Sequence, residues 1–338
     1  MEHVWREAPM PPLEGEVVER QRNRRGLSVN RAVKPLSQFC RFRSAVKTAS
    51  SPFRGALGKT GTRPHSTGRS IPPTCGRMPH DKTFGCRLIM DSYKALAASY
   101  DRLTRDVNYA DAVNFYFEIL KRENVRPRTA ADLACGTGSV TKLLARRGLP
   151  VIGVDLSEDM LTQAQQKNME VTPRPVFLHQ NLSALYLPRG VDMAVCALDS
   201  LDYITDPREC QTAIRRVFKA LNPGGIFIFD VNTPEKLHAM DGQVFLDEDD
   251  DVYCVWRGDF DRDTNILSYG MDLFQRQGKA WLRSFEEHRE YAYSQNQLTG
   301  FLKEAGFTRI CVYGDRKFSA PGEGEQRIFF SARKGTIK

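Results

Sequence analysis

The chain has 338 residues, 41% of them hydrophobic, and carries a formal net charge of +8. This length is enough for one large domain with a substantial core, and no run of about 18 apolar residues predicts a membrane span. The positive charge is unevenly spread: residues 1–89 hold 17 Lys and Arg against 6 Asp and Glu, whereas residues 90–338 hold 32 against 35. The second part is therefore not expected to bind nucleic acid through a basic surface.

Residues 1–89 differ in composition from the rest. They contain nine of the 18 prolines and only one aspartate, Asp81, and no hydrophobic periodicity persists in them. Such a segment cannot bury enough apolar surface to offset the entropy of ordering the chain, so we predict a disordered basic extension. A transit peptide or a basic tail for anionic partners are alternatives. A further alternative is that the natural protein starts at Met90, where the composition changes.

From residue 111 onward the chain alternates between short apolar strands and amphipathic helices. This alternation predicts a mostly parallel sheet with helices on both faces. The pattern predicts a turn at residues 222–225 and a solvated loop in the acidic run 247–251. Helices are expected at residues 111–122, 139–147, 157–168, 207–221 and 294–305, and strands at 130–134, 151–155, 176–179, 191–197, 226–230, 308–313 and 326–332.

Residues 241–293 interrupt this alternation. Residues 252–260, 265–275 and 280–293 read as longer strands separated by turn-like breaks. We predict a small antiparallel insertion in the α/β unit. Because it follows a strand that ends at the ligand-binding rim of an open α/β sheet, we expect it to lie on the substrate side.

Eight cysteines are scattered along the chain with no Cys-x-x-Cys pair and no cluster of histidines beside them. This pattern predicts neither a zinc site nor a disulfide framework, so we expect no bound metal. Scattered cysteines are typical of reduced thiols, and the first residues lack the apolar stretch of a signal peptide. We therefore expect a cytoplasmic protein.

The motif Asp132-Leu-Ala-Cys-Gly136-Thr-Gly138 follows an expected strand and opens an expected helix. Glycine lets the backbone turn sharply and approach a ligand closely. Asp155 ends the next strand, where a carboxylate can accept hydrogen bonds from the hydroxyls of a ribose. Thr141 stands where a dinucleotide-binding loop has its third glycine, which favours an adenosine ligand without a pyrophosphate.

With these motifs the sequence resembles the class I S-adenosylmethionine (SAM) dependent methyltransferases, over residues 93–334. The glycine-rich motif is followed by Val-Ile-Gly-Val-Asp155-Leu-Ser-Glu-Asp-Met-Leu and by Leu221-Asn-Pro-Gly-Gly-Ile-Phe-Ile-Phe-Asp230, in the family's order and spacing. The chain is most similar to small bacterial members with an antiparallel insertion. The resemblance implies a Rossmann-like, seven-stranded, mostly parallel sheet over residues 90–338.

The resemblance also implies SAM as cofactor and assigns residues to it. Gly136 and Gly138 would flank the methionine part, and Asp155 would bind the ribose. Asn181 stands where many members have an aspartate that contacts the adenine amino group, and Ala134 where many have glycine. The full set of expected cofactor residues is Tyr100, Asp132, Ala134, Cys135, Gly136, Thr137, Gly138, Asp155, Leu156, Met160, Asn181 and Leu198.

A catalytic residue is harder to predict, because SAM chemistry needs an aligned nucleophile and a general base only when that nucleophile arrives protonated. The candidates are Asp199 and Tyr203, which follow the fourth expected strand, and His288 in the insertion. His288 alternates with hydrophobic residues, so an exposed strand position with no catalytic role is the alternative.

The sequence favours methyl transfer to a nitrogen or oxygen of a small molecule. Residues 199–203 lack the Asp/Asn-Pro-Pro-aromatic signature of enzymes that methylate planar amino groups of bases or glutamine. Two alternatives remain open: an RNA or protein methyltransferase that docks through the basic extension, and a non-catalytic SAM-binding module.

Overall fold

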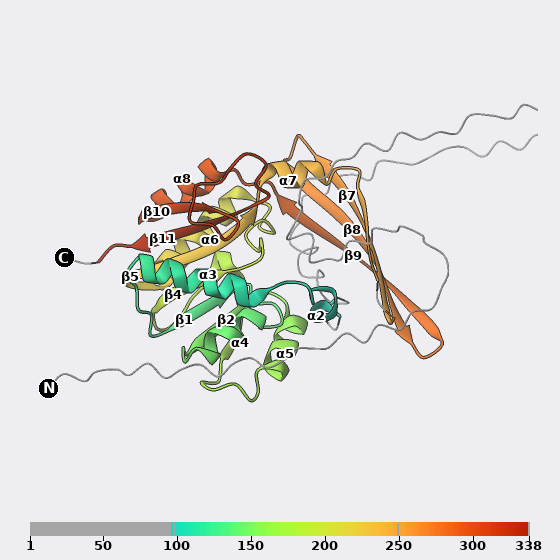
Figure 1. Cartoon of the computed structure of the whole chain (residues 1–338), viewed down its shortest axis with the longest axis horizontal. Helices are drawn as coiled ribbons and strands as arrows, with labels where there is room; N and C mark the ends of the chain where they lie inside the picture. Colours follow the sequence, from blue (N-terminus) through green and yellow to red (C-terminus); the bar gives the residue numbers. More distant parts are fainter. Residues whose placement is uncertain (1–95, 98, 249, 337–338) are drawn as a thin grey trace, which may run out of the picture. The chain divides into compact units, whose positions relative to one another are not determined.

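The computed structural model of the protein describes residues 96–97, 99–248 and 250–336 (Figure 1). The expectations for the extension at residues 1–89 and for a start at Met90 lie outside the described residues. The described chain contains a seven-stranded sheet and a separate four-stranded sheet. None of its helices is long and apolar enough to cross a membrane.

The seven-stranded sheet has the order β10-β11-β5-β4-β1-β2-β3. Strands β3, β2, β1, β4 and β5 pair with one another in parallel, whereas β11 is antiparallel to both β5 and β10. The predicted mostly parallel sheet of seven strands is therefore confirmed. Its strands are β1 (Ala130–Leu133), β2 (Val151–Asp155), β3 (Val176–His179), β4 (Val191–Cys196), β5 (Leu221–Asn232), β10 (Phe307–Gly314) and β11 (Arg327–Lys334).

Helices cover both faces of this sheet (Figure 1). Alternate residues of β5 point to opposite sides: Phe227 and Phe229 belong to the apolar cluster under α6 and α8, and Ile226 and Ile228 to the cluster under α3 and α4. This period of two is what a strand buried on both faces requires. The helices are α3 (Tyr109–Arg122), α4 (Ser139–Arg146), α5 (Glu158–Lys167), α6 (Pro207–Ala220) and α8 (Gln295–Ala305).

The helix starts follow from capping side chains in the sequence. Ser157 accepts a hydrogen bond from the backbone of Met160 and begins α5, as predicted. Asp206 caps α6 with Pro207 in the first turn, and Ser294 forms a capping box with Gln297 at the start of α8.

The predicted turn at residues 222–225 is wrong, because these residues lie within β5. Val191 of β4 pairs with Leu221, and Met193 pairs with Ile226. The residues between the two pairs bulge out of the strand, and Gly224 supplies the positive φ of 77° that the bulge needs. Turn-forming residues therefore lengthen the strand rather than precede it.

The predicted antiparallel insertion is confirmed as a four-stranded sheet of order β6-β7-β8-β9. The expected solvated loop at 247–251 is wrong in part, because Asp247 lies in β6 opposite the buried Cys254 and is only 4% exposed. The strands are β6 (Val244–Glu248), β7 (Val252–Asp261), β8 (Ile266–Gln277) and β9 (Ala280–Tyr291), preceded by α7 (Pro234–Ala239).

One face of this second sheet is buried. Cys254, Trp256 and Met271 form an apolar cluster with Leu103 of α2 (Tyr100–Leu103) and Leu237 of α7. The aromatic residues Trp281 and Phe285 of β9 are instead exposed. The buried face brings β8 and β9 against the segment that begins α2.

Candidate functional site

A cavity enclosing about 1000 Å³, part of it open to solvent, lies at the carboxyl ends of β1, β2 and β4. A smaller one of about 350 Å³ shares Tyr100, Ala134, Gly136, Leu198 and Ser200 with it. Ligands of open α/β sheets bind at this edge. Of the residues expected from the sequence, the larger cavity is lined by Tyr100, Ala134, Gly136, Asp155, Leu156, Met160, Asn181, Leu198 and Tyr203, and the smaller one also by Asp132, Cys135 and Thr137.

The glycine-rich loop carries three residues with positive φ: Ala134 (52°), Gly136 (53°) and Gly138 (73°). A Cβ atom on Gly136 would meet no atom within 4 Å, so this residue borders open cavity. A Cβ atom on Gly138 would lie 2.7 Å from the Nδ2 atom of Asn168. Gly136 therefore leaves room for a ligand, whereas Gly138, which lines neither cavity, leaves room for α5.

Asp132, near the end of β1, supports the glycine-rich loop through a contact with α4. Its side chain is buried, and the Thr141 hydroxyl donates to it over 2.5 Å. Burial raises the pKa of Asp132 to about 7, although the hydrogen bond from Thr141 opposes that shift. The threonine at the position of the missing third glycine thus ties α4 to β1.

Asp155 lies at the end of β2, where it contacts the glycine-rich loop and lines the larger cavity. Its carboxylate accepts hydrogen bonds from the backbone N–H groups of Gly136 (2.7 Å) and Ser157 (2.9 Å). Burial raises the pKa of Asp155, whereas these hydrogen bonds lower it. The carboxylate is held in the cavity wall by two backbone donors from different segments.

Tyr100 is held at the cavity by its neighbour Asp101. The Asp101 carboxylate accepts a hydrogen bond from the Thr137 hydroxyl (2.7 Å) and pairs with the Lys167 ammonium (2.7 Å). Lys167 also donates to Ser139. Sequence reasoning missed Asp101 and Lys167, because the contact links α2 to α5 across the glycine loop.

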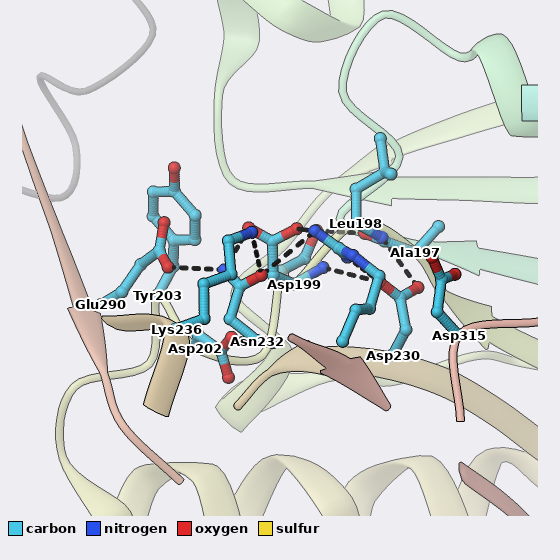
Figure 2. A network of polar contacts seen from close by, with 12 residues as sticks. Ala197, Leu198, Asp199, Asp202, Tyr203, Asp230, Asn232, Lys236, Glu290 and Asp315 are labelled. Carbon is cyan, nitrogen blue, oxygen red and sulfur yellow. Dashed lines mark hydrogen bonds and ion pairs between the residues drawn. The ribbon is translucent and has the colours of Figure 1, made fainter. Parts of the chain in front are cut away.

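The wall of the cavity beyond β4 is a strained turn. Leu198 and Asp199 have φ values of 56° and 54°. The Asp230 carboxylate accepts hydrogen bonds from both of their backbone N–H groups, at 2.9 and 3.2 Å. Arg327 of β11 pairs with Asp230 and, over 2.5 Å, with Asp199 (Figure 2). These contacts hold two non-glycine residues in a conformation that costs energy.

Asp199, a catalytic candidate in the sequence, therefore lines neither cavity. Burial opposes its ionisation, but the nearby Arg327 and Lys236 outweigh burial and lower its pKa. A carboxylate held this firmly in its charged form is a poor proton acceptor. Its position supports the turn that presents Leu198.

Tyr203 does line the larger cavity, and its hydroxyl leads into a buried polar network, of which Figure 2 shows the contact between Glu290 and Asn232. Its hydroxyl lies 2.5 Å from that of Tyr269, which donates to Glu290 over 2.7 Å. The other Glu290 oxygen accepts from Asn232 (2.9 Å), which in turn accepts from Lys236. Sequence reasoning missed Glu290, although it shares a strand face with His288.

The alternative that His288 is an exposed strand residue is wrong, because the side chain is 1% exposed. Its ring stacks on Tyr269 with centroids 5.3 Å apart, and its Nε2 atom lies 3.3 Å from a Glu286 oxygen. His288 lines neither cavity. Over the described ranges, no group of three or more His, Cys, Asp or Glu side chains is placed to hold a metal ion.

Comparison with known proteins agrees with this geometry. A family model described as a methyltransferase domain matches residues 130–225. YqeM of Bacillus subtilis (strain 168), a protein named as a methyltransferase, is 32% identical over 244 residues, which cover 72% of this chain and 97% of YqeM. The crystal structure of a SAM-dependent methyltransferase from Clostridium acetobutylicum ATCC 824 is 30% identical, with a TM-score of 0.66, and covers 72% of this chain and 100% of that one.

The chain belongs to the class I SAM-dependent methyltransferases. The methyltransferase is also similar to a ubiquinone biosynthesis O-methyltransferase of Pseudomonas fluorescens (strain SBW25), with 29% identity over 121 residues. That match covers 35% of this chain and 50% of the relative.

The cofactor of the methyltransferase is SAM, and the described residues fit it. The open space in front of Gly136 is where a side chain would compete with a ligand. The Asp155 carboxylate in the cavity wall could accept hydrogen bonds from ribose hydroxyls. The cavity also includes Leu156 and Met160, which are apolar side chains suited to the face of an adenine ring.

Proposed function

We propose that the enzyme transfers a methyl group from SAM to a nitrogen or oxygen atom of a small molecule. The observation that supports this most is that Asp155, Gly136 and Tyr203 line a single cavity of about 1000 Å³. Residues from the ends of β1, β2 and β4 thus surround one concave site, which is the usual setting of a small-ligand pocket. The O-methyltransferase relative acts, by its name, in ubiquinone biosynthesis.

The residues of the chain would bind and orient the two reactants. SAM supplies a methyl group on a positively charged sulfur, which is already a good leaving group. Gly136 would leave the space of the methionine part open, Asp155 would bind the ribose, and Leu156 and Met160 would pack on the adenine. Alignment of the acceptor within this cavity supplies the main rate effect.

Asn181 would contact the adenine edge through its amide. Its Oδ1 atom already accepts a hydrogen bond from the Ser183 backbone at 2.8 Å. Its Nδ2 group is therefore the better candidate to donate to a ring nitrogen. This replaces the contact that an aspartate makes with the adenine amino group.

Residues 241–293 would provide the acceptor side of the site. Tyr269 and Glu290 of this segment reach Tyr203 in the cavity wall through hydrogen bonds. The segment itself lines neither cavity and is joined to the larger one through Tyr203. Residues 1–89 would have no role in the reaction.

Replacing Asp155 with alanine is expected to weaken SAM binding by roughly 10- to 150-fold, because a hydrogen bond to a charged group contributes about 1.5–3 kcal/mol. Calorimetric titration with SAM measures this dissociation constant. Asp159, an exposed carboxylate of the following helix, provides a matched control, and Asp159→Ala should bind SAM as the wild type does. An unchanged dissociation constant for Asp155→Ala would remove the ribose assignment.

Incubation with methyl-labelled SAM and fractionated cell extract tests the proposed function. We expect label in the low-mass fraction, with and without residues 1–89. Label in RNA or protein that disappears on deletion of residues 1–89 would favour a macromolecular acceptor. SAM binding with no label in any fraction would favour a non-catalytic module.

A further inference from the structure

A line of hydrogen bonds runs from the cavity wall to a buried carboxylate. It begins at Tyr203, which lines the cavity, and passes through Tyr269 to the Oε1 atom of Glu290, over distances of 2.5 and 2.7 Å. Tyr203 follows β4, whereas Tyr269 lies on β8 and Glu290 on β9, two positions beyond the register partner of Tyr269. The line therefore crosses from the parallel sheet to the insertion.

The direction of the hydroxyl groups follows from their chemistry. A tyrosine hydroxyl has a single hydrogen, and that of Tyr269 is donated to Glu290. In the bond between the two tyrosines, Tyr203 is then the donor. Both hydrogens point toward Glu290, and a phenol oxygen that donates its hydrogen can also accept hydrogen bonds. Burial raises the pKa of Tyr203 well above its usual value, so this group stays a neutral phenol.

Glu290 ends the line in a mixed electrostatic environment. Its Oε2 atom accepts a hydrogen bond from Asn232, whose Oδ1 atom accepts one from the Lys236 ammonium over 2.6 Å. Burial raises the pKa of Glu290 to about 7, and the nearby Asp199 carboxylate acts in the same direction. Lys236 lowers this pKa. Among the described residues, further charged or titratable groups around the network are Asp202, Arg327 with its partner Asp230, and His288 with its neighbour Glu286. A carboxylate with a pKa near 7 suits proton transfer at neutral pH.

We propose that Tyr203, Tyr269 and Glu290 carry away the proton that the methyl acceptor loses. This inference rests on the proposed function. The acceptor's nitrogen or oxygen bonds to the methyl carbon while the carbon–sulfur bond breaks, and the electron pair of that bond stays on sulfur. The acceptor's proton passes to Tyr203, the Tyr203 proton to Tyr269 and the Tyr269 proton to Glu290, which becomes a neutral carboxyl group.

In this mechanism Tyr203 is the catalytic residue, because it alone touches the acceptor. Tyr269 and Glu290 act through it. The positive charge that leaves the sulfur is matched by the negative charge lost from Glu290, so the reacting groups end neutral. The route also explains why a glutamate is buried here beside two other carboxylates.

Sinefungin and S-adenosylhomocysteine (SAH) test the route without an identified acceptor. Sinefungin carries an amino group on carbon in place of the methyl-bearing sulfur, and alkylamines of this type stay protonated below about pH 9. SAH has no group at that position. The ratio of the two dissociation constants therefore reports whether Tyr203 accepts a hydrogen bond where the acceptor's proton would lie.

We expect the wild type to bind sinefungin at least about tenfold more tightly than SAH at about pH 8, because a charged group donates to Tyr203. This preference should decline toward about pH 6 as Glu290 takes up a proton and its negative charge is lost. Calorimetric titrations at several pH values measure both ligands.

Tyr203→Phe, Tyr269→Phe and Glu290→Gln should each reduce the preference and remove its dependence on pH. Their affinity for SAH should stay within about threefold of the wild type, which also shows that the variants are folded. Tyr253→Phe, on the exposed face of β7, is the matched control and should behave as the wild type.

A preference that does not change with pH in the wild type would overturn the proposed route. So would a wild-type preference in Tyr203→Phe or Glu290→Gln. If one of these variants fails to fold, the other two still break the line at different atoms and decide the result. Failure of the wild type to bind either ligand would instead contradict SAM binding and the proposed function.

Discussion

Replacing Gly136 with valine is expected to abolish SAM binding with only a moderate loss of stability. A Cβ atom at this position would meet no protein atom within 4 Å, so the new side chain would project into the cavity and occupy the space of the cofactor. A β-branched residue at a φ of 53° costs about 1–3 kcal/mol of stability. Calorimetric titration with SAM and thermal unfolding measure the two effects.

Gly138→Ala is the matched control for the same loop. Its Cβ atom would collide with Asn168 on α5 rather than enter the cavity. We expect it to lower stability, and any SAM binding it retains shows that positive φ alone does not prevent binding. If Gly136→Val bound SAM as tightly as the wild type, the glycine-rich loop would not be part of the cofactor-binding site.

The second large effect is expected from Arg327→Met, which should lower the free energy of unfolding by about 3–5 kcal/mol. Arg327 has a side chain only 4% exposed and pairs with the carboxylates of Asp199 and Asp230. Methionine fills a similar volume but leaves Asp230 buried without its cation and Asp199 with only Lys236 nearby, which is the costly way to break such a network. Urea unfolding measures the change.

Arg283→Met provides the control, because Arg283 also pairs with an aspartate, Asp272, but its side chain is 63% exposed. Exposed ion pairs of this kind contribute up to about 1 kcal/mol. Arg327→Met should also weaken SAM binding, since Asp230 holds the turn that presents Leu198. Equal stability losses in the two variants would show that the buried network does not support the fold.

The sequence alone predicted the features that depend on neighbouring residues. The glycine-rich loop, the cap at Ser157 and the strand that ends at Asp155 all follow from local conformational preferences and short-range periodicity. These features meet at one side of the larger cavity, which is why Ala134, Gly136, Asp155, Leu156 and Met160 lie together. The fold class followed because strands and helices alternate over more than a hundred residues.

The rest of the site depends on contacts between distant residues. Arg327 and Asp199 are 128 positions apart, and no local pattern indicates that they meet. Strand alternation assigns His288 and Glu290 to one face of β9, but it does not indicate which face is buried. The alternative of an exposed position for His288 is wrong for this reason. The residues at 222–225 have turn chemistry, yet pairing on both sides keeps them within β5.

The attachment of α2 to the glycine loop bears on how product leaves. The Asp101 carboxylate is 49% exposed and the Lys167 side chain 24%, so water and dissolved ions reach this pair. Such a pair contributes no more than about 1 kcal/mol and weakens as ionic strength rises. We therefore expect this pair, which helps to position Tyr100, to open more readily than the buried ion pairs of Arg327, and such opening would let the product nucleoside leave.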